Sequence, residues 1–102
     1  MKTGIPMAVP WYPDESNYLA VLGMLPASER ENPLAYDVFR SKLELLEKEC
    51  QRGGSITRRV PIDAIALKAW CDANGHNVCR KTIGAFITFR MVSDIEQSTG
   101  KN

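Results

Sequence analysis

Long hydrophobic runs are absent from this chain. No apolar stretch approaches the roughly 20 residues that a membrane-spanning helix needs, so we expect a soluble protein that has no membrane partner. The three cysteines are an odd number, and no apolar region typical of a signal peptide precedes them. We therefore expect free thiols in a reducing compartment, and a cytoplasmic location.

Catalytic motifs are missing as well. The chain has no glycine-rich phosphate loop, no H-E-x-x-H and no G-x-S-x-G sequence. Cys79 would lie near a helix start, where the pKa of a thiol falls, and His76 is nearby in the sequence. This pair alone identifies no reaction, so we predict no catalytic residue, no enzymatic activity and no cofactor.

The cysteines suggest one alternative, a zinc site. Cys71, His76 and Cys79 follow one another closely, and Cys50 would complete a set of four ligands. Their spacing matches no standard zinc pattern, however, and unpaired cysteines are common core residues. We therefore predict no bound metal.

Length and charge indicate one small domain with an uneven surface. The 102 residues suffice for one modest core, and the formal net charge is +1. Residues 1–52 carry eight acidic and six basic side chains, a charge of −2, whereas residues 53–102 carry four acidic and seven basic ones, a charge of +3. This asymmetry favours a C-terminal half that faces an anion.

Prolines divide the first third of the chain. We predict an extended N-terminal arm over residues 1–12, a single helical domain over residues 13–97 and a disordered tail over residues 98–102. Pro13 suits a first helical turn, which predicts a short helix from Pro13 to Met24. Residues 27–31 are interpreted as a polar connection.

The most clearly delimited helix spans Pro33 to Arg52. Asn32 caps its predicted start, and Gly53-Gly54 ends it. Its apolar side chains fall on two stripes of a helical wheel, which require two surfaces to pack against: the core, and either the N-terminal helix or a second copy of the chain. The wider stripe contains Ala35, Tyr36, Phe39, Leu43, Leu46 and Cys50, and the narrower one contains Leu34, Val38 and Leu45.

A third helix is predicted between Pro61 and the Asn74-Gly75 stop. The preceding residues, 55–60, fit either a short strand or an extended loop. We expect the helix to be covered from both sides. Its main buried arc contains Ile62, Ile65, Ala66, Ala69, Trp70 and Ala73, and a weaker opposite arc contains Ala64, Leu67 and Cys71.

The last predicted helix runs from about residue 78 to at least residue 90, although its β-branched and aromatic side chains also suit a strand. The predicted fold class is therefore mainly α, a compact bundle of about four helices with a helix-turn-helix-like pair. The alternative is an α+β fold with a small wing or hairpin from residues 55–60 and 84–92.

The two helices around Asn74-Gly75 predict a nucleic-acid-binding surface. A helix start offers free N–H groups and partial positive charge to a phosphate. The alternative is that the same polar residues form only the solvated face of a soluble helical protein. The predicted contacts are Arg58, Arg59, Asn77, Arg80, Lys81, Thr82 and Thr88.

Part of this region also carries a family resemblance. With Leu67, Trp70-Cys71, Asn74-Gly75 and Phe86, the segment from Trp70 to Phe86 resembles winged-helix segments of phage and plasmid primase-helicase proteins. The resemblance implies a DNA-contacting second helix with Arg80 and Lys81, in a protein of a mobile element. It names no family for the whole chain, and because no ATPase motif accompanies it, it implies no replication chemistry.

Two functions remain as expectations. The first is a small DNA-binding, helix-turn-helix-like accessory or regulatory protein. The alternative is a protein-interaction or assembly module that pairs with itself as a homodimer or with another protein. Its predicted contacts are Trp11, Leu34, Val38 and Leu45.

Overall fold

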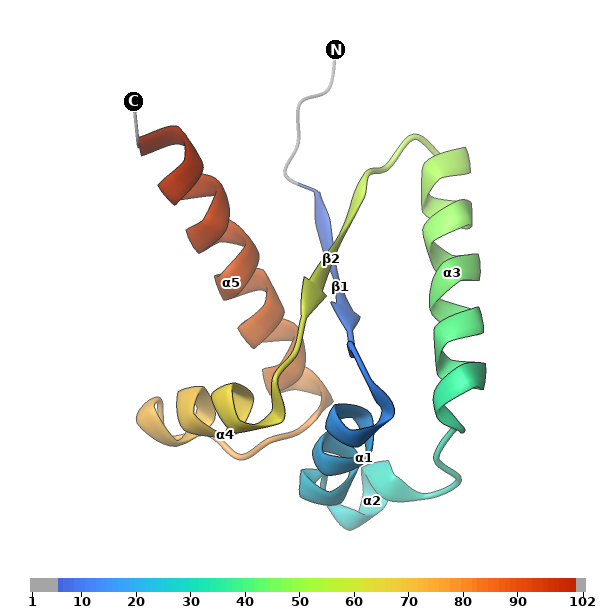
Figure 1. Cartoon of the computed structure of the whole chain (residues 1–102), viewed down its shortest axis with the longest axis vertical. Coiled ribbons are helices and arrows are strands. Elements are labelled where there is room, and N and C mark those ends of the chain that lie inside the picture. The colour runs from blue at the N-terminus through green and yellow to red at the C-terminus, as the bar shows by residue number, and fades with distance from the viewer. Residues whose placement is uncertain (1–5, 101–102) are drawn as a thin grey trace.

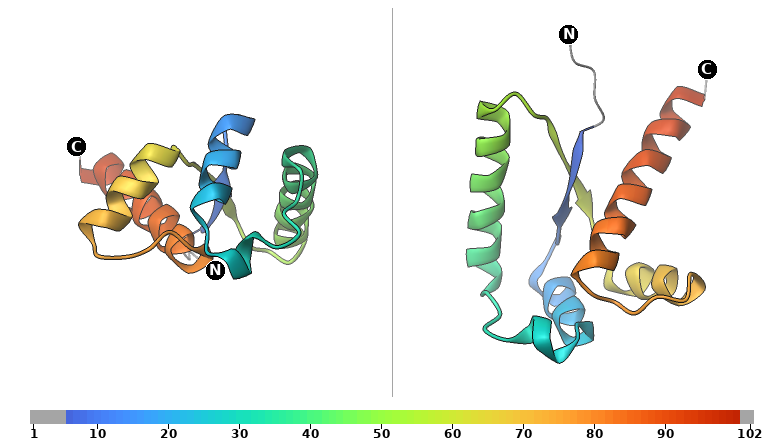
Figure 2. Two further views of the ribbon diagram at one scale, coloured as in Figure 1. Left: turned by 90° about the horizontal axis from the view of Figure 1, so that it is seen from below. Right: turned by 180° about the vertical axis from the view of Figure 1, so that it is seen from behind.

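The computed structural model describes residues 6–100 and the side chains of residues 6–97. Strands β1 (Met7–Trp11) and β2 (Thr57–Pro61) form a parallel sheet. In Figures 1 and 2, α3 and α5 flank this sheet on opposite sides, while α1, α2 and α4 gather near one end of it. The helices are α1 (Glu15–Met24), α2 (Ala27–Arg30), α3 (Tyr36–Arg52), α4 (Ala64–Ala73) and α5 (Arg80–Gly100).

The two faces of the sheet meet different helices, because side chains alternate along a strand. Arg59 stacks on Trp11 and bonds to Glu47 of α3, so this face of the sheet looks toward α3. Val60 and Ala8 lie on the other face and pack into the main core together with residues of α5. The sheet is therefore covered by one helix on each side.

The prolines of both strands occupy positions that need no sheet hydrogen bond. The N–H of Met7 bonds to the carbonyl of Ile56, and the N–H of Ile62 bonds to the carbonyl of Trp11. The backbone N–H and C=O groups of odd-numbered residues in β1 and even-numbered residues in β2 therefore face the neighbouring strand. Pro10 and Pro61 therefore face the outer edges, where a missing N–H costs nothing and discourages further pairing.

The mainly helical class is confirmed, with a small sheet that the preferred prediction did not include. Residues 7–11 of the predicted N-terminal arm are extended, but they are paired with β2 as a strand. The alternative fold had a strand near residues 55–60, and β2 confirms it, but its second strand, residues 84–92, is wrong because this segment lies inside α5. α5 continues to Gly100, and residues 101–102 of the predicted tail lie outside the described residues.

The predicted helix boundaries agree with the structure to within two residues except at the starts of α3 and α4. α4 begins at Ala64 rather than at Pro61, because Pro61 is the last residue of β2 and Asp63 caps the helix. α1 begins one residue after Asp14, whose carboxylate accepts the N–H of Asn17 at 2.9 Å. α3 begins at Tyr36 rather than at Pro33, because the hydroxyl of Tyr18 donates to the carbonyl of Leu34 at 2.6 Å and the chain is still extended at Ala35. Asn32 has a left-handed φ of 50° and caps no helix. Residues 27–30 of the predicted connection form the single turn α2.

The buried side of α4 was predicted wrongly. Its core face is the arc thought weaker, Ala64, Leu67 and Cys71. Ile65 is 80% exposed, because α4 packs on α1 and α5 from one side only. Ala69 and Ala73 are exposed with it, Ala66 and Trp70 are half-buried, and Ile62 is buried but precedes the helix.

The main core joins α1, β2, α4 and α5. Among the described residues, none of its fully buried members comes from α3, whose Tyr36 and Phe39 only pack against its side. The buried residue of α3, Leu43, lies outside this cluster, as does Val9 of β1. The members are Tyr12, Tyr18, Val21, Leu25, Val60, Ile62, Ala64, Leu67, Cys71, Val78, Ile83, Phe86, Ile87 and Met91.

Candidate functional site

The helix pair predicted from the sequence is present. α4 ends at the predicted stop: Gly75 has a φ of 70°, and the N–H of His76 bonds back to the carbonyl of Cys71 at 2.8 Å. Residues 74–79 then lead into α5, which crosses α4 in Figure 1. The pair has the order of a helix-turn-helix, with the start of α5 as the element that would meet a nucleic acid.

The start of α5 is already occupied by groups of the protein. The carboxylate of Glu29, on α2, accepts the N–H of Arg80 at 2.8 Å. The Thr82 hydroxyl oxygen accepts the N–H of Cys79 at 2.8 Å and lies 2.8 Å from the carbonyl oxygen of Asn77. These bonds satisfy N–H groups that a helix start otherwise offers to an anion, so a phosphate would compete with Glu29.

Of the cationic side chains predicted to contact a nucleic acid, Arg59 is held by other groups of the protein, whereas the others form no ion pair within the described residues. The Arg59 guanidinium forms two hydrogen bonds of 2.9 Å with Glu47 and lies 4.0 Å from the centre of the Trp11 ring. In the part of the chain that is described, the side chains of Arg58, Arg80 and Lys81 form no ion pair. Asn77 and Thr88 are exposed, whereas the hydroxyl of Thr82 serves the helix cap.

The outer face of α5 carries little positive charge. Lys81, Ala85, Thr88 and Phe89 are exposed at helical spacing along it. Of these four side chains only Lys81 is cationic, and Phe89 is apolar and half-exposed. Arg80 departs from this face and lines a cavity instead.

The thiols and the histidine do not form a metal centre. Among residues 6–97, no three His, Cys, Asp or Glu side chains are placed to hold a metal ion together. Cys71 is fully buried, and His76 lies against Trp70, with ring centres 6.2 Å apart. A hydrogen bond from the Thr82 hydroxyl, helped by backbone N–H groups at the helix start, lowers the pKa of the Cys79 thiol.

The narrower apolar stripe of α3 faces away from the sheet. Val38 and Leu45 are 42% and 55% exposed on α3, whereas Leu34 is 39% exposed but lies before the helix. Trp11, predicted with them, does not share this surface, because its ring is stacked by the guanidinium groups of Arg40 and Arg59 at 4.7 and 4.0 Å. The structure thus leaves three of the four predicted interaction residues open.

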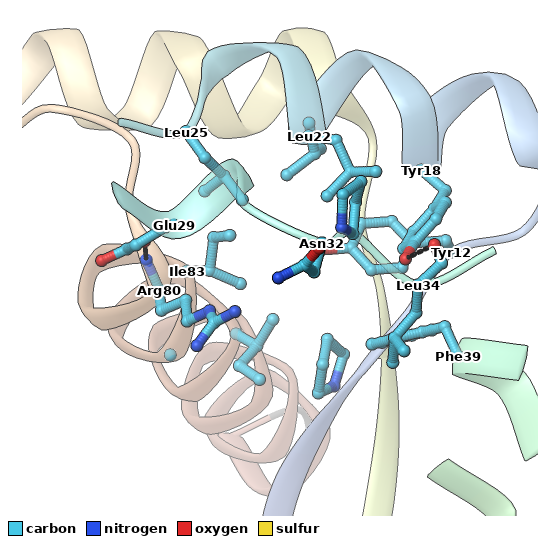
Figure 3. Close-up of a pocket in the computed structure, with 15 residues that line it drawn as sticks. Tyr12, Tyr18, Leu22, Leu25, Glu29, Asn32, Leu34, Phe39, Arg80 and Ile83 are labelled. Atoms are coloured by element: carbon cyan, nitrogen blue, oxygen red, sulfur yellow. Dashed lines mark hydrogen bonds between the residues drawn. The ribbon is translucent and has the colours of Figure 1, made fainter. Parts of the chain in front are cut away.

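A cavity of about 410 Å³ lies between α1, residues 32–34 and the first turns of α5. Figure 3 shows Leu22 and Leu25 on one side of it, Ile83 on another, and Asn32 and Arg80 pointing toward it. The sequence offers no sign of this cavity, because its walls come from four separate segments and their apolar residues match ordinary core positions.

Among the described residues, no helix is both long and apolar enough to cross a membrane. The comparisons with known proteins add no family: no family model matches this chain, and no curated protein or solved structure matches it significantly. The resemblance of Trp70 to Phe86 to winged-helix segments therefore stays a prediction, and a function has to be argued from the surfaces just described.

Proposed function

We propose that this protein is an assembly module that pairs with a second copy of itself through the outer face of α3. The observation that supports the proposal is the exposure of Val38 and Leu45 on a helix whose opposite side packs on the sheet. Helices of a monomer normally turn such side chains inward, and a repeated apolar stripe on the outside is typical of a helix that meets a partner.

The spacing of the stripe favours a second copy as the partner. Val38 and Leu45 are seven residues, or two turns, apart, and Ser41 lies between them, one turn after Val38. A two-fold axis between Ser41 and Lys42 would place Val38 of each chain against Leu45 of the other, with the small side chain of Ser41 beside the axis. Leu34, predicted with these residues, precedes the helix and lines the cavity beside α5, so it is not part of this outer face.

The expected dimer is weak. Complete burial of a Val or Leu side chain stabilises by roughly 1.5–3 kcal/mol, and these side chains are already about half covered. Association of two chains costs at least about 4 kcal/mol of lost freedom of motion. The dimer should therefore form at high protein concentration and dissociate on dilution.

Sedimentation equilibrium from micromolar to millimolar protein tests the proposal. The average mass of the parent protein should rise with concentration, whereas Val38→Glu should remain monomeric. Gln51→Glu is the matched control, since it adds the same charge to an exposed position of α3 away from the stripe. A parent protein that stays monomeric throughout, or a control that dissociates like Val38→Glu, would refute the pairing.

Nucleic-acid binding is the second candidate function. It is favoured by the exposed side chains of Arg80 and Lys81 at the start of α5, beside Asn77, which form no ion pair within the described residues. Binding through these cations should weaken steeply with salt, because released counterions dominate the affinity. Glu29 at the helix start and the low charge of the outer face of α5 count against it.

A titration with duplex DNA at low and moderate salt, followed by fluorescence anisotropy, tests the second candidate. Replacing both Arg80 and Lys81 by Ala should weaken binding and reduce the salt dependence by about one phosphate contact per cation. Lys48→Ala, which removes an exposed cation from α3, is the control. Binding that ignores salt, or equal loss in the control, excludes this function.

A further inference from the structure

The cavity beside α5 has the properties of a small-molecule site. Its volume of about 410 Å³ falls within the range of known ligand pockets, and its walls are mostly apolar. Leu22 and Leu25 at the end of α1, together with Ile83 and Ile87 of α5, supply the aliphatic walls. An apolar ligand body could therefore replace water there.

The polar groups at the cavity are few and lie together. Arg80 and Asn32 both point toward it from opposite walls, and Glu29 lies beside Arg80 (Figure 3). One oxygen of Glu29 accepts the backbone N–H of Arg80, and within the described residues the Arg80 guanidinium has no carboxylate partner. Its donors remain available to an acceptor on a ligand.

A glycine enlarges the cavity on the side of α5. Gly84 lines it one turn after Arg80, and a Cβ atom built on Gly84 would meet nothing within 4 Å. Glycine at this helical position therefore leaves space that a larger residue could fill. Neither a close contact nor a left-handed backbone requires it.

We propose that this cavity binds a small amphiphilic carboxylate. The apolar tail would lie against Leu22, Leu25 and Ile83, and the carboxylate would meet the Arg80 guanidinium and the Asn32 amide. A guanidinium forms strong, directed hydrogen bonds with a carboxylate, which sets this class of ligand apart from neutral or cationic amphiphiles. Because Val38 does not line the cavity, this proposal and the pairing of α3 can fail separately.

The test uses octanoate as the probe and follows the backbone amides of the whole chain by NMR, below the micelle concentration. Octanoate should cause saturable shifts in residues 31–35 and in the first turns of α5. Acetate, which lacks the tail, should cause none there. Octyltrimethylammonium, which has the same tail and the opposite charge, should bind at least about tenfold more weakly.

Two variants and one matched control identify the site. Arg80→Gln should weaken octanoate binding by about tenfold, since it removes a charge-assisted contact from an exposed residue that the fold does not need. Lys81→Gln removes the adjacent cation, which does not line the cavity, and should leave binding unchanged. Gly84→Leu should fill the cavity and abolish the shifts, while the spectrum still shows a folded protein.

Several outcomes would overturn the proposal. These are no saturable shift in the parent protein, equal binding of the cationic amphiphile, and equal weakening by Arg80→Gln and Lys81→Gln. If the parent protein binds no octanoate and Gly84→Leu no longer self-associates, the cavity would instead be where a side chain of a second copy binds.

Discussion

α5 and α3 lie on opposite sides of the same two strands but are held there by different contacts. α5 contributes Ile83, Phe86, Ile87 and Met91 to the main core, all nearly inaccessible to solvent. α3 buries Leu43 and otherwise meets the sheet through the Glu47–Arg59 ion pair and the stacking of Arg40 and Arg59 on Trp11.

An aromatic cluster attaches the N-terminal end of α3. Tyr36 donates its hydroxyl to the carbonyl of Tyr12 at 2.6 Å, and the Phe39 ring lies 5.4 Å from that of Tyr12 and 5.2 Å from that of Tyr18. The contrast indicates that α5 maintains the fold, whereas α3 is a lightly attached helix whose outer apolar residues are not needed for the core. Such a helix is suited to contact a partner.

The largest loss of stability should come from a substitution in the buried face of α5. Phe86 is 2% exposed, so Phe86→Ala should lower the free energy of unfolding by roughly 3–5 kcal/mol. Phe89→Ala, on the same helix but at a 50% exposed position, should cost under about 1 kcal/mol. Urea unfolding of the two variants measures the difference. Similar losses would mean that α5 is not packed as described.

The second largest effect should show that α3 and α5 differ in local stability. Leu43→Ala removes the buried residue of α3 and should cost about 2–3 kcal/mol, near the lower end for a buried leucine. Amide hydrogen exchange should then accelerate in α3 far more than in α5, because α3 can open without exposing the main core. One common exchange rate for both helices would contradict the contrast.

High pH should loosen the aromatic attachment of α3. Burial, with a smaller contribution from Tyr18, raises the pKa of Tyr12 from 10.0 to about 12. A raised folded pKa stabilises the protein fully below about pH 10, and this contribution of up to roughly 3 kcal/mol is lost as pH rises toward 12. Unfolding measured from pH 8 to 12 should show a smaller decline in Tyr12→Phe than in the parent. Identical profiles would show that Tyr12 does not titrate in this way.

The smallest effect should come from the ion pair between α3 and the sheet. Glu47→Gln removes the charge that meets Arg59, and because Arg59 is partly exposed the cost should be at most about 1 kcal/mol. The difference between this variant and the parent should shrink at high salt. A loss that is much larger and independent of salt would place this pair among the main supports of α3.

Local sequence patterns predicted where the helices lie, but not which of their faces are buried. Asp14 and Asp63 cap α1 and α4 within two residues of the predicted helix starts, and Gly75 follows α4 at the predicted stop, because a cap depends only on neighbouring residues. The buried face of α4 was mistaken because periodicity identifies apolar stripes without saying which one is covered. Ile65 and Leu67 are equally apolar, and only the positions of α1 and α5 distinguish them.

The amino-acid sequence by itself determined the four longer helices and the Asn74-Gly75 turn, and indicated that α3 has two apolar stripes, because these depend on residues within a few positions of one another. The tertiary structure alone decided that residues 7–11 pair with residues 57–61, that Glu29 occupies the start of α5, and that a cavity opens beside Gly84. Each of these joins segments separated by about fifty residues or more, and no local pattern records which distant surfaces meet when the core closes.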